Sequence, residues 1–500
     1  MQIQGAASAV QTSRRRDGTS KRRAASRANG AWRSLLLAGT CAAGMVARAA
    51  GTMITSFELV DISGTISTDK KFSDAVLVGD GRVVFCPLDA NAVVVFDPTA
   101  QPESSFTSVD ISTTINTAGK FWGGALAGDG RVVFAPYAAD GVGVFDPTDD
   151  SFTLVDISAT ISSNYKFWGA ATAGDGRVVF APCNADGVGV FDPTDDSFSL
   201  VDISTTINAD AKFVGAVVVG DGRVVFAPRH AHGVGVFDPT NDSFSLVDIR
   251  GTIDEQEKFY GAALAGDGRV VFAPRNADSV GVFDPTDNSF ALVDISTTIN
   301  MDFKFSDAAA VGDGRVVFAP SEADGVGVFD PTDDSFTLVD ISATISSNYK
   351  FYGAAVAGDG RVVFAPYYAG GVGVFDPTDD SFTFVDISAT VNMLAKFIGV
   401  AALGDGRVVF SPAMADGVGL FDPRDDTFSL VDISGLMDGT NQKFSGANLV
   451  GDGRVVLTPF CAEDVGVFSS PPGTDWCDCC EARMAKLGLN LDRVCVLPPL

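Results

Sequence analysis

The chain has 500 residues and a formal net charge of −28, and this charge is unevenly distributed. Residues 1–50 hold nine Lys or Arg against one Asp, which makes +8, so residues 51–500 carry −36. An acidic body of this kind repels nucleic acid and anionic lipid surfaces, so we expect neither as a partner, except for a membrane if residues 1–50 form an anchor.

Residues 1–50 have the pattern of a targeting segment. A basic stretch precedes an apolar run from Leu35 to Ala47, and Ala47-Arg48-Ala49 has the small-x-small form of a cleavage site. The apolar run is short for a membrane-spanning helix. We therefore expect secretion to the extracellular space. A transit peptide for a plastid or mitochondrion and an uncleaved signal anchor are the alternatives.

Residues 51–468 are built from one repeated unit. The turn Gly-Asp-Gly-Arg occurs nine times, at spacings of 49, then 46 six times, then 47, beginning at Gly79, Gly128, Gly174, Gly220, Gly266, Gly312, Gly358, Gly404 and Gly451. A period near 46 residues with four short apolar segments is typical of the blades of a β-propeller.

Within one unit, four segments are predicted as strands, called A to D from the centre of the ring outwards. In the unit that starts at Lys166, they begin at Lys166-Phe167, Val178, Gly187 and Ser197. The segments are β-branched and aromatic, and each is too short for a helix. Asp-Gly and Asp-Pro-Thr-Asp-Asp between them are hairpin turns, because Gly supplies positive φ and Pro presets φ.

The two ends of the repeat region indicate how the ring closes. A lone D strand, Phe57 to Ile62, precedes the first A strand, whereas the ninth unit ends at Phe468 without a D strand. The sequence therefore predicts an all-β fold: a single β-propeller of about nine four-stranded blades, closed by an N-terminal outer strand that completes the last blade. A ring of fewer blades with spare units is the alternative.

Residues 469–500 form a separate tail. Pro471-Pro472-Gly473 reads as a linker, and Cys477, Cys479, Cys480 and Cys495 follow it. We expect two local disulfides in an oxidising compartment. A zinc site is the weaker interpretation, because no histidine lies near these cysteines, and we expect no cofactor.

The loops differ between the two faces of the predicted ring. The A–B turn (Gly-Asp-Gly-Arg) and the C–D turn (Asp-Pro-Thr-Asp-Asp) are nearly invariant between units, whereas the B–C and D–A loops vary at every step. Variable loops on a rigid scaffold usually carry binding, although loops also diverge where nothing restrains them. The B–C loops supply six candidate ligand-binding residues: Arg229, His230, His232, Arg275, Tyr367 and Tyr368. His230 and His232 suggest a metal or acid–base pair, but no third ligand is identifiable, and a plain exposed loop is the alternative.

Every A strand opens with Lys-Phe, and in four units an aromatic residue lies two positions beyond the lysine. If the A strands line the channel, these lysines crown its mouth and attract an anion or an acidic sugar. The candidates are Lys120, Lys166, Lys258 and Lys350 with Trp122, Trp168, Tyr260 and Tyr352. The alternative is that each lysine forms a structural ion pair with the aspartate of Val-Asp-Ile, such as Asp156 or Asp202.

Residues 146–167 recur word for word as residues 330–351, an offset of 184 residues, or four units. Block duplication explains this identity, so identity between units says little about function.

The run Gly-Asp-Gly-Arg-Val-Val-Phe-Ala-Pro followed by Ala-Asp-Gly-Val-Gly-Val-Phe-Asp-Pro-Thr-Asp-Asp-Ser-Phe resembles the repeat of virginiamycin B (streptogramin) lyase-like propellers and, more distantly, NHL-type propellers. The likeness covers about residues 57–468. It implies the fold. The lyases use a histidine–glutamate–histidine set with magnesium, but His230 and His232 share one loop here and no partner glutamate matches, so the resemblance does not transfer the activity.

We expect a non-catalytic binding or interaction module that uses the variable-loop face and channel mouth for a protein, a glycan or a small anionic ligand. A monomer is expected. The alternative is a lyase- or hydrolase-type enzyme with its site at the same mouth.

Overall fold

A computed structural model describes residues 56–100, 105–251, 253, 255–434, 442–451 and 453–469. Within these ranges no helix has the length and hydropathy needed to cross a bilayer. The expectations for residues 1–50, for the linker at residues 471–473 and for the four tail cysteines concern residues outside the described part.

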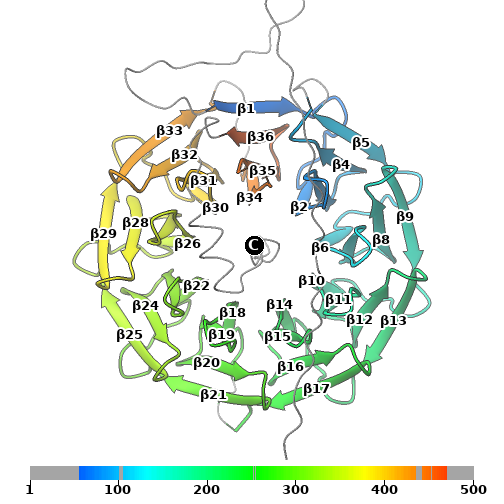
Figure 1. Cartoon of the computed structure of the whole chain (residues 1–500), viewed down its shortest axis with the longest axis horizontal. Coiled ribbons are helices and arrows are strands. Elements are labelled where there is room, and N and C mark those ends of the chain that lie inside the picture. The colour runs from blue at the N-terminus through cyan, green and yellow to red at the C-terminus, as the bar shows by residue number, and fades with distance from the viewer. Residues whose placement is uncertain are drawn as a thin grey trace, which may run out of the picture. The chain divides into compact units, whose positions relative to one another are not determined.

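The described chain forms nine four-stranded antiparallel sheets, arranged as the blades of a propeller (Figure 1). Blade 1 contains β2 (Phe72–Leu77), β3 (Val83–Pro87), β4 (Ala92–Phe96) and β5 (Phe106–Asp110); blade 2 contains β6 (Phe121–Leu126), β7 (Val132–Pro136), β8 (Gly141–Asp146) and β9 (Ser151–Asp156); blade 3 contains β10 (Phe167–Thr172), β11 (Val178–Pro182), β12 (Gly187–Asp192) and β13 (Ser197–Asp202). Blade 4 contains β14 (Phe213–Val218), β15 (Val224–Pro228), β16 (Gly233–Asp238) and β17 (Ser243–Asp248); blade 5 contains β18 (Phe259–Leu264), β19 (Val270–Pro274), β20 (Ser279–Asp284) and β21 (Ser289–Asp294); blade 6 contains β22 (Phe305–Ala310), β23 (Val316–Pro320), β24 (Gly325–Asp330) and β25 (Ser335–Asp340). Blade 7 contains β26 (Phe351–Val356), β27 (Val362–Pro366), β28 (Gly371–Asp376) and β29 (Ser381–Asp386); blade 8 contains β30 (Phe397–Ala402), β31 (Val408–Pro412), β32 (Gly417–Asp422) and β33 (Thr427–Asp432); blade 9 contains β34 (Phe444–Leu449), β35 (Val455–Pro459), β36 (Asp464–Ser469) and β1 (Ser56–Asp61).

The ring closes as the sequence predicts. The strand β1 pairs antiparallel with β36, with Phe57 opposite Phe468 and Leu59 opposite Gly466. The N-terminal strand is therefore the outer strand of blade 9. Val465 and Val467 of this blade join one hydrophobic cluster with Phe72 and Phe85 of blade 1. The prediction of nine blades with an N-terminal closing strand is confirmed.

Hydrophobic layers between neighbouring blades form the core. Val179 and Val190 of blade 3, for example, pack with Phe213 and Phe226 of blade 4, and Ile203 fills the space between them. The B and C strands are buried on both faces for this reason, whereas the outer D strands alternate between exposed and partly buried residues. Each layer therefore depends on residues of two successive units.

The invariant turns connect neighbouring blades on one face of the ring. Arg131 of the A–B turn in blade 2 lies 2.6 Å from the carboxylate of Asp129 in the same turn. It also reaches the C–D turn of blade 3, donating to the Pro193 carbonyl at 2.7 Å and to Asp196 at 2.6 Å. These bonds explain why the two turns change little between units.

Candidate ligand-binding site

The nine lysines that open the A strands are buried, with relative exposures of 0–3%. The lysine side chains run towards the B–C loop of the preceding blade. Lys304 donates to the Asn276 carbonyl at 2.9 Å and lies 3.0 Å from the Asp278 carboxylate. Burial lowers the pKa of Lys120 and Lys350. These lysines link neighbouring blades.

The prediction of an exposed rim of ammonium groups at Lys120, Lys166, Lys258 and Lys350 is therefore wrong. Loop carbonyls and loop aspartates replace water around these groups; Lys166, for instance, lies 3.4 Å from Asp140. The alternative pairing with the Val-Asp-Ile aspartate is wrong as well. Asp156 is exposed and accepts a hydrogen bond from the backbone N–H of Ser158 at 2.8 Å.

A continuous row of aromatic and arginine side chains lies on the variable-loop face. This row contains all seven tyrosines of the protein and two of its four tryptophans. We call it the aromatic arc; its members are Trp122, Tyr137, Tyr165, Trp168, Arg229, Glu257, Tyr260, Arg275, Phe303, Tyr349, Tyr352, Tyr367 and Tyr368. These residues come from the starts of A strands and from the B–C and D–A loops of blades 2 to 7 and the connections between them.

The first part of the arc is an aromatic cluster. The ring centroids of Trp122 and Tyr137 lie 5.2 Å apart, those of Tyr137 and Tyr165 lie 4.7 Å apart, and those of Trp122 and Trp168 lie 5.6 Å apart. Burial raises the pKa of Tyr137 to about 12, so its hydroxyl stays protonated. The indole Nε1 atoms of both tryptophans are buried without a hydrogen-bond partner among the described residues.

An ion cluster occupies the middle of the arc. Arg229 lies over the Trp168 ring, 5.2 Å from its centroid, and donates to Glu257 at 2.8 Å. The other oxygen of Glu257 lies 3.4 Å from Nε of Arg275. Burial opposes ionisation of Glu257, but the bond from Arg229 and the charge of Arg275 outweigh it and hold the pKa of this carboxyl below its usual value. Two guanidinium groups thus share one carboxylate.

The last part of the arc surrounds Arg275, whose guanidinium lies 4.7 Å from the ring centroid of Tyr260 and 4.6 Å from that of Phe303. The hydroxyls of Tyr260 and Tyr352 lie 3.1 Å apart, although these residues belong to blades 5 and 7. The intervening blade 6 has only Ser306 at the corresponding position. Burial and the neighbouring Tyr260 raise the pKa of Tyr352.

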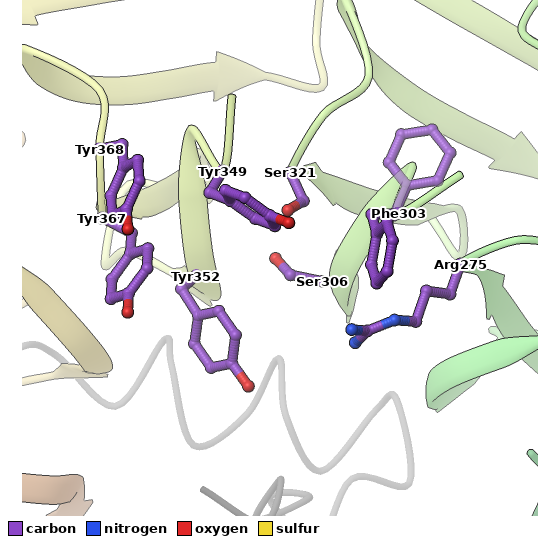
Figure 2. A pocket seen from close by; sticks show the side chains of 9 residues that line it. Arg275, Phe303, Ser306, Ser321, Tyr349, Tyr352, Tyr367 and Tyr368 are labelled. Carbon is purple, nitrogen blue, oxygen red and sulfur yellow. The ribbon is translucent and has the colours of Figure 1, made fainter. Parts of the chain in front are cut away.

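A cavity of about 170 Å³ opens beside Arg275. Figure 2 shows Arg275 on one side of the cavity, pointing towards Ser306, Ser321 and Tyr352. Tyr367 and Tyr368 lie on the other side. No carboxylate is among the residues that line it, which are Arg275, Phe303, Phe305, Ser306, Ser321, Tyr349, Tyr352, Tyr367 and Tyr368. One cation, six hydroxyl-bearing side chains and two phenyl rings therefore face this space.

The residue before each A-strand lysine has positive φ. Glycine adopts this backbone at little cost, as at Gly119 with φ 65°. Tyr165, Phe303 and Tyr349 adopt it with φ of 57°, 55° and 48°. A bulky side chain in this region costs about 1–3 kcal/mol. The chain thus holds three arc aromatics in a strained conformation, which the repeat imposes at this position in every unit.

The two histidines have different neighbours. His230 lies close to Arg229 and Glu257, and burial together with the Arg229 charge lowers its pKa. His232 lies close to Asp248 at the end of the outer strand β17. In the described part of the chain, no group of three or more His, Cys, Asp or Glu side chains is placed to hold a metal ion. The structure therefore does not bring His230 and His232 together as a pair facing one site.

The structure brings eight of the predicted site residues into the arc: Trp122, Trp168, Tyr260, Tyr352, Arg229, Arg275, Tyr367 and Tyr368. Seven further residues of the arc and cavity were not predicted from the sequence: Tyr137, Tyr165, Glu257, Phe303, Tyr349, Ser306 and Ser321. One signal was available for the tyrosines, because all seven lie at strand starts or loops of the same predicted face.

No family model matches the sequence, and no curated protein matches it. Among solved structures, the chain is similar to a catalytically inactive virginiamycin B lyase from Staphylococcus aureus with quinupristin, at 15% identity and a TM-score of 0.44, covering 61% of this chain and 94% of that one. A streptogramin B lyase gives 17% identity and a TM-score of 0.42, covering 61% and 93%. The extracellular domain of BT4673 from B. thetaiotaomicron gives 12% and 0.39, covering 85% and 64%. The likeness to these proteins is one of fold.

Proposed function

We propose that the chain is a non-catalytic binding module and that its ligand is a small anion or glycan bound on the aromatic arc. One observation carries the proposal: a cavity on the variable-loop face has an arginine, six hydroxyl-bearing residues and phenyl rings in its wall, and no carboxylate. Concave sites that combine aromatic walls with a few convergent polar groups are typical ligand sites.

Charge supports an anionic ligand. Glu257 forms its shorter bond, 2.8 Å, with Arg229 and lies 3.4 Å from Arg275. Arg275 lines the cavity, and Figure 2 shows its guanidinium directed into the space beside Tyr352. A guanidinium in this position binds a carboxylate through paired hydrogen bonds. The acidic body of the protein acts over longer distances and is screened by salt.

The proposal includes a monomer that works outside the cytoplasm. It is supported by the basic and apolar pattern of residues 1–50. An organelle or a membrane-anchored location remains the alternative, and a protein partner on the same face is the alternative ligand.

A lyase- or hydrolase-type enzyme at the same mouth is the second candidate, and Asp307 favours it. Burial raises the pKa of Asp307 to about 7, which suits general acid–base catalysis. Against this role, the two carboxylate oxygens already accept the backbone N–H groups of Ala308 at 2.7 Å and Ala354 at 3.0 Å. We therefore prefer the binding module.

The test is a thermal-shift screen of the full chain against acetate, benzoate, D-glucose and D-glucuronate. A ligand present at one hundred times its Kd stabilises the folded state by about 2.7 kcal/mol, so Tm rises. We expect a rise with at least one anion. Arg275→Ala should weaken that binding at least tenfold, because a hydrogen bond to a charged group contributes about 1.5–3 kcal/mol.

Arg424→Ala is the matched control, since Arg424 lies in a C–D turn on the opposite face and pairs with Asp422. It should leave the shift unchanged. The proposal is overturned if none of the probes raises Tm, or if Arg275→Ala and Arg424→Ala behave alike. Turnover of a probe would favour the enzyme instead.

A further inference from the structure

Two parts of the ring, four blades apart, are related in sequence, and the cavity lies in the later one. Residues 330–351 repeat residues 146–167, four blades earlier, so each wall residue except Arg275 has a counterpart 184 positions before it. Tyr349 corresponds to Tyr165, and Tyr352 corresponds to Trp168. Two wall positions carry much smaller side chains than their counterparts: Ser306 corresponds to Trp122, and Ser321 corresponds to Tyr137.

In the earlier part, the large side chains occupy the equivalent space. Trp122 contacts Tyr137 at a centroid distance of 5.2 Å. Trp122 also contacts Trp168 at 5.6 Å, and Tyr137 contacts Tyr165 at 4.7 Å. Trp168 and Tyr165 are the counterparts of two residues in the cavity wall, Tyr352 and Tyr349. The cavity therefore exists because serines stand at positions 306 and 321, where the related part of the ring has aromatic side chains.

The later part also has a cation at a position where the earlier part has an apolar residue. Arg275 directly follows β19, and the residue at the same place in blade 1, directly after β3, is the buried Leu88. Phe303, which packs on the guanidinium, corresponds to Gly119. The space opened by the serines thus coincides with the introduction of a cation and of the ring that supports it.

We propose that this cavity is a subsite for one carboxylate-bearing sugar ring, with Arg275 binding the carboxylate and with Ser306 and Ser321 admitting the ring. This inference rests on the proposed function and specifies its ligand. A cavity of about 150 Å³ holds one benzene molecule, so 170 Å³ admits one six-membered ring.

The hydroxyl groups of the wall favour a sugar acid over an aromatic acid. Ser321, Tyr367 and Tyr368 line the cavity together with Ser306, whose hydroxyl donates to the Phe351 carbonyl at 3.0 Å and keeps lone pairs to accept from a ligand. The ring of an aromatic acid offers these hydroxyls no hydrogen-bond partner, whereas the hydroxyls of a sugar acid do. The faces of the tyrosine rings suit the C–H groups of a pyranose.

Isothermal titration of the full chain with D-glucuronate, D-glucose and benzoate tests the inference. We expect one glucuronate per chain and at least tenfold weaker binding of glucose and benzoate. Ser306→Trp and Ser321→Tyr, which restore the side chains of the related part, should each weaken glucuronate binding at least tenfold. Ser306→Ala, which keeps the space open and removes one hydroxyl, should weaken glucuronate binding less than either filling variant does.

Ser445→Trp is the matched control. Ser445 holds the same A-strand position in blade 9, and its hydroxyl donates to the Phe72 carbonyl as that of Ser306 donates to Phe351. It should disturb stability like Ser306→Trp but leave glucuronate binding unchanged. If Ser306→Trp fails to fold, as judged by its melting curve, the affinity of Ser321→Tyr for glucuronate tests the subsite.

The outcomes separate this inference from the proposed function. If glucuronate binds but neither filling variant weakens it, the subsite is wrong. If benzoate binds at Arg275 and glucuronate does not, the sugar class is wrong while the binding module stands. If no anion binds, both the subsite and the proposed function are wrong.

Discussion

Individual aspartates in this fold have opposite effects on its pH dependence. Turn residues such as Asp146 and Asp192 accept hydrogen bonds from a threonine side chain and backbone, which lower their pKa. Asp74 and Asp307 stand in A strands where most blades have glycine, and burial raises the pKa of each to about 7. Burial also raises the pKa of Asp464 to about 6.

The sign of the effect follows from proton binding. Between about pH 4 and 7 the folded chain holds protons on Asp74 and Asp307 that the unfolded chain releases, because the ordinary value is 3.8. We therefore predict that the free energy of unfolding decreases as pH rises through this window. Stability supplied by the turn aspartates is lost only below about pH 4, as pH falls through their lowered pKa values.

Asp307→Asn should reduce this decrease, because the amide does not titrate. The measurement is urea denaturation of both proteins at several pH values between 4.5 and 7.5. Asp69→Asn, at an exposed loop position, is the control and should follow the original curve. An unchanged slope in Asp307→Asn would contradict the raised pKa.

At the scale of the strand, glycine permits the close packing of each blade. A Cβ atom on Gly189 of β12 would lie 2.7 Å from the Phe167 ring and 2.9 Å from the Phe180 ring. Both rings are fully buried. We predict that Gly189→Ala destabilises the fold by about 1–3 kcal/mol, since overpacking forces the neighbours to shift.

Gly251→Ala is the control for this prediction. It lies in a D–A loop where no atom is within 4 Å of an added Cβ. Its effect should stay within about 0.5 kcal/mol in the same denaturation measurement. Equal losses at the two positions would mean that the rings around Gly189 relax freely.

The sequence predicts these elements well because each repeat carries its own strand and turn chemistry. It predicts the direction of the lysine side chains poorly. Alternation along a strand indicates which residues lie on the same side of the sheet. The carbonyl that accepts a hydrogen bond from Lys304, however, belongs to the loop of the preceding blade. That partner depends on how two units stack, and the pattern of one unit does not contain this information.

At the scale of the whole molecule, the ring brings together residues that the sequence separates. Tyr260 and Tyr352 meet across a whole blade, 92 positions apart. The number of blades and the closing strand were predictable, because they follow from counting A, B, C and D segments. The arc and its cavity were not, because the space at Ser306 becomes visible only once both neighbouring blades are in place.

Ring closure makes β1 different from the other outer strands. In blades 1 to 8, the C and D strands are joined by a short turn, so a detached D strand remains close to its partner. β1 and β36 are instead joined through the entire ring, and among the described residues their pairing and side-chain packing hold them together. When β1 detaches, no chain connection crosses the junction between blades 9 and 1, whereas a detached D strand elsewhere still links its blade to the next.

We therefore predict that Leu59→Asp in β1 speeds global unfolding on the order of tenfold more than Leu246→Asp, the same position of the D strand β17. Both leucines are half-buried and lie opposite a glycine of the C strand, Gly466 and Gly235 respectively. The measurement is the unfolding rate in concentrated urea, with hydrogen exchange along β36 as the local readout. In Leu59→Asp, the amides of β36 should exchange before those of any other C strand, because loss of β1 leaves them at an open sheet edge. Equal unfolding rates in the two variants would show that the closing strand is no weaker than a D strand joined by its turn.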